Sequence, residues 1–180
     1  MATVFDIANF FVDLANKTDD DYITNLKLNK LLYFAQGVSL ARTDKALFQE
    51  PIEAWKFGPV IPSIYKKYKD LGKMPIQVTD TNYTSEIFTN QEISILIDVM
   101  REFGIYTGGK LVALTHAPDT PWSKSFNNNE KIISNEDIKE YFTKHPVKEF
   151  CLKDDIKQVN KLPKEWYDSN EDSIWEAYLE

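Results

Sequence analysis

The sequence is poor in the residues that most often build catalytic and metal sites. It holds one cysteine, Cys151, and two histidines, His116 and His145, among 180 residues. A lone cysteine forms no internal disulfide, so we expect a reducing compartment, the cytoplasm. The three residues lack the short spacing of zinc ligands, and no Gly-x-Ser-x-Gly segment offers a nucleophilic serine. We therefore expect no metal, no cofactor and no enzymatic activity.

Long apolar runs and an excess of positive charge are also missing. No stretch approaches the length that spans a bilayer. The chain carries 21 Lys and Arg against 28 Asp and Glu, a formal net charge of -7. Nucleic-acid binding depends on clustered basic residues, whereas pairs such as Lys27 and Lys30 are expected on solvated helix faces. These features argue against nucleic-acid and membrane partners and favour a basic partner protein.

Apolar periodicity is what the chain does have, and it predicts a mainly α fold. The length suits a single compact helical domain of about six helices with a small β or irregular element and a C-terminal extension. The small element is expected near 52–57 and 76–88. Apolar spacing and flanking residues predict helices over 4–16, 25–42, 63–71, 91–103, 108–116 and 134–144.

Polar residues at the helix ends refine this prediction. The second helix starts after a cap at Thr24 or Asn25, and Asn90, Thr107 and Ser134 are expected to cap later helices. The second helix has a wide apolar face, which implies contacts on two sides. Its basic residues are expected in solvent: Lys27, Lys30 and Arg42.

Two segments combine aromatic residues with proline. In EAWKFGPVIPSIY, residues 53–65, a Gly58-Pro59 corner is expected to stand among Trp55, Phe57 and Tyr65. In the second segment, Pro118 and Pro121 are expected to form a rigid turn that presents Trp122. The aromatic residues either fill the core at a bend or anchor a protein contact.

The position of His116 allows two interpretations, one structural and one functional. It ends a predicted helix, where it can bond a free carbonyl and complement the helix dipole. It can also belong to a polar hot spot in a binding groove.

The last part of the chain, 147–180, differs from what precedes it. It mixes charge with scattered aromatic residues, and we predict a domain over 1–146 followed by this extension. The final stretch is acidic, yet helical spacing aligns four large side chains on one face: Ile174, Trp175, Tyr178 and Leu179. This face is expected either to pack on the domain or to contact a partner.

Three ordered blocks carry a resemblance to a known family. They are TNLKLNKLLYFAQG from Thr24, EAWKFGPVIPSIYKKYKDLG from Glu53, and GGKLVALTHAPDTPW, which ends at Trp122. Together they closely resemble the Panacea antitoxin domain, also called the SocA-like or phage-associated GepA family. The resemblance covers about residues 1–145.

The resemblance implies a mainly helical antitoxin that neutralises a cognate toxin, encoded by an adjacent gene, through direct protein contact. The alternatives are an adaptor that delivers a toxin to the ClpXP protease, a phage-associated interaction protein, or a hydrolase or nuclease that depends on His116. Whether the protein forms a homo-oligomer is left open. The candidate partner-binding or motif residues are Tyr33, Gln36, Trp55, Gly58, Pro59, Val60, Pro62, Tyr65, Thr115, His116, Pro121 and Trp122.

Overall fold

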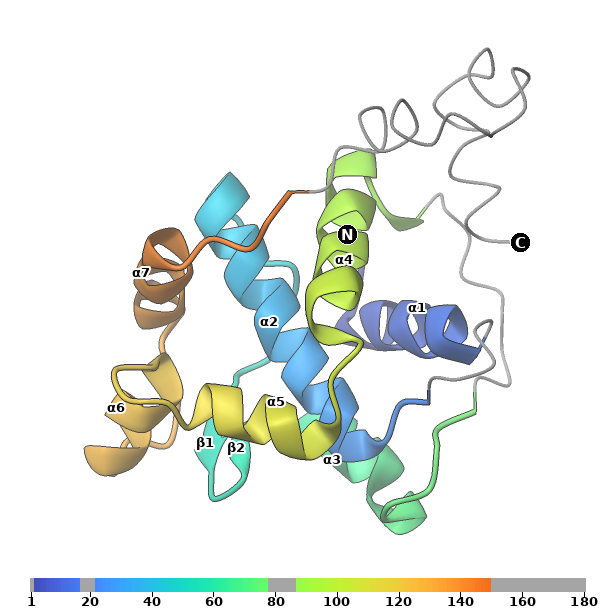
Figure 1. Ribbon diagram of the computed structural model, residues 1–180, viewed down its shortest axis with the longest axis horizontal. Helices are drawn as coiled ribbons and strands as arrows, with labels where there is room; N and C mark the ends of the chain where they lie inside the picture. The colour runs from blue at the N-terminus through green and yellow to red at the C-terminus, as the bar shows by residue number, and fades with distance from the viewer. Residues whose placement is uncertain (1, 17–21, 78–86, 150–180) are drawn as a thin grey trace. The chain divides into compact units, whose positions relative to one another are not determined.

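The computed structural model describes residues 2–16, 22–77 and 87–149, and their fold is mainly α, as the apolar periodicity predicts. Figure 1 shows the helices packed around α2, with one small hairpin beneath it. In chain order the elements are α1 (Val4–Asn16), α2 (Asn25–Thr43), β1 (Glu53–Trp55), β2 (Gly58–Val60), α3 (Pro62–Tyr68), the 3-10 helix η1 (Lys69–Leu71), α4 (Asn90–Phe103), α5 (Gly108–Thr115), α6 (Pro121–Asn127) and α7 (Asn135–Lys144).

Helix α2 is the centre of the fold. It contacts α1, α3, α4, α5, α7 and β2, and its residues are buried continuously from position 27 to position 40. The wide apolar face of its sequence is consistent with this position, because a helix covered on all sides has little use for a solvated stripe.

The expectation that the basic residues of α2 lie in solvent is wrong for Lys27 and Lys30. Lys27 is 5% exposed and Lys30 is fully buried. Their ammonium groups donate to backbone carbonyls at 2.6 Å and 2.8 Å, those of Gly104 and Pro59. Arg42 is half-buried and pairs with a carboxylate oxygen of Asp98 at 2.6 Å. Helices and the hairpin cover every side of α2, so its polar positions are covered too and need internal partners.

The predicted caps are largely confirmed. The side chains of Thr24, Thr107 and Ser134 each accept a backbone N–H from the first turn of their helix. The cap of α4 is Thr89 rather than Asn90, which is the first helical residue. Thr89 and Glu92 bond to each other's backbone N–H in a capping box, an arrangement that fixes the helix start one residue earlier.

The small β element predicted near 52–57 is a hairpin with a two-residue turn, while most of the other predicted region, 76–88, lies outside the described residues. In β1 and β2, Trp55 pairs with Gly58 and Ala54 pairs with Pro59. The turn therefore lies at 56–57, and the Gly58-Pro59 corner predicted from the sequence is part of a strand. Pro59 fits there because the N–H of Ala54 opposite it donates outward, to the carbonyl of Lys131 at 2.8 Å. Ala54 and Pro59 therefore form a non-hydrogen-bonded pair of the antiparallel ladder. A residue at such a pair donates no N–H to the opposite strand, so proline is tolerated there.

The second proline segment is also different from its prediction. Pro121 does not end a turn; it is the first residue of α6, and the Thr120 hydroxyl caps this helix by accepting the N–H of Ser123 at 3.2 Å. Proline favours the first helical position because its missing N–H would have no partner there. Pro62 starts α3 in the same way. The fold thus has seven α-helices in its described part, one more than predicted.

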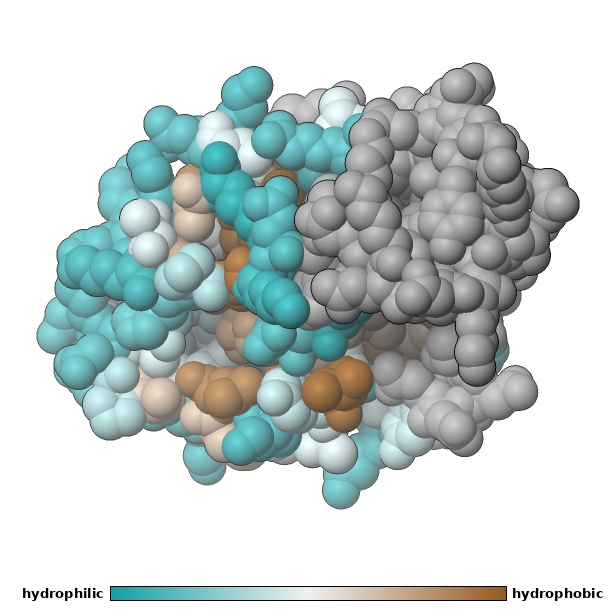
Figure 2. Space-filling view, turned by 45° about the horizontal axis from the view of Figure 1, so that its top comes forward, coloured by the Kyte–Doolittle hydropathy of each residue, from teal (hydrophilic) through white to brown (hydrophobic). Residues whose placement is uncertain are grey.

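On the face that Figure 2 shows, the surface of the described residues is mostly hydrophilic. Figure 2 shows hydrophobic residues, in brown, gathered in small groups among teal ones. None of the helices in this part of the chain is long and apolar enough to cross a membrane. The first compact unit of the chain reaches Val147. Most of the predicted extension, including Ile174, Trp175, Tyr178 and Leu179, lies outside the described residues, so its role stays a prediction.

Candidate partner-binding site

The three sequence blocks come together around the β1–β2 hairpin. Helix α2 from the first block contacts β2, which belongs to the second. From the third block, α5 contacts β2 and α6 contacts β1. Figure 1 shows α5 and α6 beside the hairpin, although more than 40 residues separate them from it in the sequence. Residues that seemed independent in the sequence thus form one structural unit.

Polar side chains of α2 satisfy the outer edge of β2. The Lys30 ammonium donates to the carbonyl of Pro59 at 2.8 Å, and the Asn29 side-chain oxygen accepts the N–H of Ile61 at 2.9 Å. A strand edge that is buried without partners would be costly, so these two side chains take the place of a third strand. They also fix the hairpin to the central helix.

The Lys30 ammonium has an unusual environment. Its side chain is fully buried, and burial lowers its pKa from the ordinary 10.5 to about 7. The only hydrogen bond of the ammonium in the described residues is the one to Pro59. A carbonyl only partly replaces the water that a charged ammonium loses on burial, so the neutral amine is favoured.

Gly58 allows α2, β2 and α5 to approach one another closely. Its φ is 99°, in the region that favours glycine. A Cβ at this position would lie 2.8 Å from the Lys30 Cε and 2.8 Å from the Thr115 hydroxyl oxygen. Glycine is therefore required at position 58 for two reasons: the positive φ, and the lack of space for a Cβ.

Trp122 joins α6 to the hairpin. Its ring is 8% exposed, and its indole N–H donates to the carbonyl of Trp55 at 2.8 Å. His116 lies against one part of the ring, with centroids 3.8 Å apart, and Phe126 stacks on it at 4.7 Å. Trp122 was expected to be presented by a turn, but it is packed between α6 and the hairpin. We call the packed unit of α2, α5, α6 and the hairpin the frame of the site.

His116 lies between charged and aromatic neighbours. Burial lowers the pKa of its imidazole, the nearby Lys30 charge lowers it further, and a hydrogen bond with the Lys56 backbone acts in the opposite direction. Its Nε2 atom is buried and has no hydrogen-bond partner in the described part of the chain. No carboxylate among the described residues bonds to this ring, so the His116-dependent hydrolase hypothesis finds no orienting acid there.

Around this frame, large aromatic side chains reach the surface. Trp55 is half-buried; its indole N–H donates to Glu53 at 2.7 Å, and its ring meets Tyr65 edge to face at 4.9 Å. Phe57, Tyr65 and Phe126 are 63%, 38% and 41% exposed. We call Trp55, Phe57, Tyr65 and Phe126 the aromatic surface. Sequence analysis did not single out Phe126, because no helix was predicted after the Pro118-Pro121 turn.

The comparison with protein families identifies the chain. Residues 28–123, more than half of its length, match the family described as "Antitoxin SocA-like, Panacea domain". The chain belongs to this family. It is also 32% identical over 127 residues to the "Antitoxin SocA" of Caulobacter vibrioides (strain NA1000 / CB15N), an alignment that covers 64% of this chain and 66%, just under two thirds, of that protein. No solved structure matches the chain.

Several other motif residues of this Panacea domain lie in its interior. Gln36 binds the loop that follows α2: its side-chain oxygen accepts the N–H groups of Leu47 and Phe48, and its amide donates to the Phe48 carbonyl at 3.0 Å. Tyr33 is buried between Phe34 and Phe142, and burial raises the pKa of its hydroxyl. The remaining buried motif residues are Pro59, Val60, Thr115 and Pro121. These residues hold the frame, and a direct role in partner contact stays a prediction for them.

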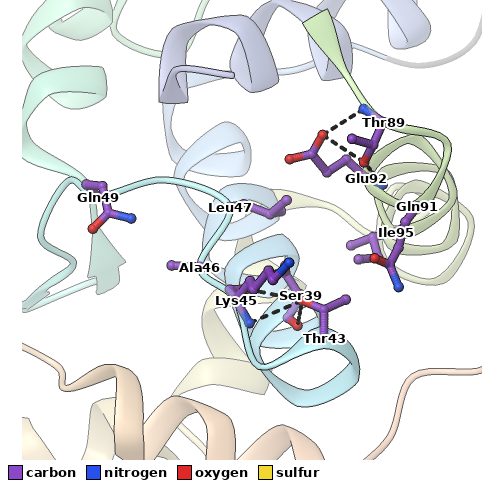
Figure 3. A pocket seen from close by; sticks show the side chains of 10 residues that line it. All are labelled: Ser39, Thr43, Lys45, Ala46, Leu47, Gln49, Thr89, Gln91, Glu92 and Ile95. Atoms are coloured by element: carbon purple, nitrogen blue, oxygen red, sulfur yellow. Dashed lines mark hydrogen bonds between the residues drawn. The ribbon is translucent and has the colours of Figure 1, made fainter. Parts of the chain in front are cut away.

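The Panacea domain also has a groove of 460 Å³ between the end of α2 and the start of α4. Figure 3 shows that the Thr89–Glu92 capping box stands at one side of it and Lys45 at the other. The capping box uses the N–H groups of Thr89 and Glu92 internally. In the described residues, no group of three or more His, Cys, Asp or Glu side chains could hold a metal ion.

The environment of Lys30 predicts a specific dependence of stability on pH. The unfolded chain keeps the Lys30 proton up to a pH near 10.5, whereas the folded chain releases it near 7. Since the unfolded state binds more protons between these values, raising the pH favours folding, and burial of Lys30 is most costly at low pH. The free energy of unfolding should rise by about 1 kcal/mol per pH unit above about pH 7.5.

Urea denaturation at a series of pH values measures this effect, with Lys30→Met as the control. Methionine fills a similar space without a titrating group, so the Lys30→Met variant should lack the rise. Wild type and variant with the same slope against pH would show that Lys30 keeps its ordinary pKa in the folded protein.

Proposed function

We propose that this chain is a cytoplasmic antitoxin that neutralises a cognate toxin by direct protein contact, and that the aromatic surface takes part in this contact. The observation that carries the proposal is the match of residues 28–123 to the SocA-like Panacea antitoxin family. The structure supports the aromatic surface as the contact, because Trp, Tyr and Phe are enriched at the centre of protein interfaces and bury large areas there.

The frame beneath the aromatic surface supports binding in a second way. Lys30 fixes β2 to α2, and the Trp122 indole fixes β1 to α6. A surface that is already ordered before binding loses little conformational entropy when a partner arrives. A hairpin that was free of such bonds would have to be ordered by the partner itself.

Co-expression tests the proposal. The chain is produced together with the product of a neighbouring small reading frame that arrests growth when expressed alone. We expect growth to be restored and the two proteins to purify as one complex; the absence of both would contradict the proposal. In a host that lacks ClpXP, rescue by sequestration persists, whereas rescue by a protease adaptor is lost. The elution volume of the purified chain and complex gives their stoichiometry.

A pair of matched variants tests the aromatic surface in the same assay. Phe57→Ser removes the most exposed ring of the surface, and Ile105→Ser removes a 75% exposed apolar side chain elsewhere. Because both side chains are exposed, each change should alter the free energy of unfolding by no more than about 0.5 kcal/mol. Only Phe57→Ser should weaken rescue and complex formation; equal effects of the two variants would place the contact elsewhere.

A further inference from the structure

The lysines of the hairpin tip and α3 differ in their partners from those near α6 and α7. Those near α6 and α7 are paired: Lys124 with Asp137, Lys139 with Asp44, and Lys144 with Glu140. Lys131 pairs with Glu53 at 3.2 Å. By contrast, the lysines of the hairpin tip and of α3 form no ion pair with a carboxylate in the described residues.

The unpaired lysines surround exposed aromatic rings. Positions 62, 65 and 66 of α3 and position 69, its C-cap, fall on the side opposite the buried Ile64, because they are spaced three and four residues apart. Lys66 and Lys69 thus flank Tyr65, and all three side chains are exposed. The Tyr65 ring contacts Trp55, next to the hairpin tip that carries Lys56 and Phe57. We call Lys56, Phe57, Tyr65, Lys66 and Lys69 the hairpin–α3 surface.

The neighbouring Lys67 is placed differently. Its ammonium lies 4.9 Å from the centre of the Phe5 ring on α1, and 5.2 Å from that of Tyr68. These cation–π contacts occupy Lys67 on the side of α3 that faces α1. Lys56 has a similar contact, since its ammonium lies 5.6 Å from the centre of the neighbouring Phe57 ring. Lys66 and Lys69 have none with the described residues, so their charges remain available to a partner.

The local charge of this region is opposite to that of the whole chain. Residues 56–73 contain five lysines and one aspartate, a net charge of +4, whereas the full chain carries -7. Charge at the rim of an interface sets which partners approach and in which orientation. The net charge of the chain favours a basic partner, but the surface that carries the exposed rings favours an acidic one.

We propose that the hairpin–α3 surface binds an acidic segment of the partner protein, with carboxylates against Lys66 and Lys69 and an apolar side chain against Phe57 and Tyr65. This inference rests on the proposed function and specifies the chemistry of the contact. A nucleic acid is the competing occupant, since it also suits aromatic rings among lysines. The net charge of -7 disfavours a long polyanion, which would be repelled beyond this small surface, whereas a short acidic segment needs only the local charge.

A pair of double charge reversals tests the proposal against the neighbouring gene product. Lys66→Glu with Lys69→Glu changes the surface, and Lys45→Glu with Lys110→Glu makes the same change in net charge at exposed lysines elsewhere. Titration calorimetry should show affinity weakened about thirtyfold or more by the first pair and less than about threefold by the control pair. The affinity of the wild type should fall as salt is raised.

The outcomes separate this inference from the proposed function. If the wild type binds the toxin and the two double variants weaken it alike, the acidic-segment inference is wrong while the antitoxin function stands. If no toxin binds, the function fails, and the surface is then judged with a fluorescein-labelled peptide of glutamates around one tryptophan. Binding of this peptide that is lost only in the Lys66, Lys69 variant supports the surface; no binding, or equal loss in both variants, overturns it.

Two further controls protect the interpretation. Lys66→Gln with Lys69→Gln removes the charges without reversing them, and should weaken binding in the same direction by a smaller factor. Circular dichroism should show all variants folded, because these side chains are exposed and form no ion pair within the described part of the chain. A single-stranded oligonucleotide that binds more tightly than the peptide, and depends on Lys66 and Lys69, would replace the acidic segment with nucleic acid as the occupant.

Discussion

Trp122→Ala should lower the free energy of unfolding by about 4 kcal/mol, in the range measured for large-to-small changes of buried aromatic residues. The ring is 8% exposed, so the variant leaves a cavity between α6 and the hairpin. It also leaves the Trp55 carbonyl without its indole donor and separates His116 and Phe126 from the ring between them. Urea or thermal denaturation followed by circular dichroism measures the loss.

Trp122→Phe separates packing from hydrogen bonding in this prediction. Phenylalanine keeps an aromatic ring against His116 and Phe126 but lacks the N–H that Trp55 accepts. The cost should therefore be smaller, about 1–2 kcal/mol for one lost hydrogen bond and a carbonyl left unpaired. A Trp122→Ala variant with unchanged stability and lost toxin binding would instead make Trp122 a partner anchor, as its motif position first suggested.

The helices were predictable because their signals are local. A hydroxyl side chain before an apolar repeat sets the start of a helix regardless of what surrounds it. Thr24, Thr107 and Ser134 cap their helices as the sequence indicates. The single displaced cap, Thr89, depends on a reciprocal bond with Glu92 three residues away, which is still a local signal.

The burial of Lys30 could not be predicted in this way, because it depends on a strand 29 residues further along the chain. Lysine on a helix is ordinarily solvated, and its stem is long enough to reach water from many positions. Only the approach of Gly58, which has no Cβ to displace the lysine stem, closes the structure over it. The sequence shows a glycine and a lysine in separate blocks; the contact between them is tertiary information.

Helix α6 was missed for the opposite reason: its local signal was present in the sequence but was misinterpreted. Thr120 followed by Pro121 is a cap and a favourable first helical residue, yet two prolines close together suggested a rigid turn. As a result Trp122 was expected at the surface and Phe126 was not considered. The sequence therefore identified the blocks that form the candidate surface, but it did not identify all of the aromatic rings exposed there.

Gly37→Ala should destabilise the domain by about 3 kcal/mol, although alanine in a helix interior is ordinarily preferred to glycine by about 1 kcal/mol. The reason is the contact between α2 and α7. A Cβ at position 37 would lie 2.3 Å from two atoms of the Phe142 ring and 2.8 Å from a third. Phe142 is 3% exposed and packed against Tyr33 and Phe34, so its ring has no free space to enter and α7 must move outward.

Two comparisons make this prediction specific. Gly109→Ala is the same substitution in α5, where the nearest atom to the new Cβ is 4.0 Å away, and it should stabilise the domain by about 0.4–1 kcal/mol. Phe142→Leu offers a smaller side chain to α2, so Gly37→Ala should cost less in that background than in the wild type, a coupling that a double-mutant cycle measures. Equal costs in the two backgrounds would show that Phe142 is not the obstacle. A stabilising Gly37→Ala would mean that α7 stands further from α2 in solution, and that helix propensity alone decides the effect at this position.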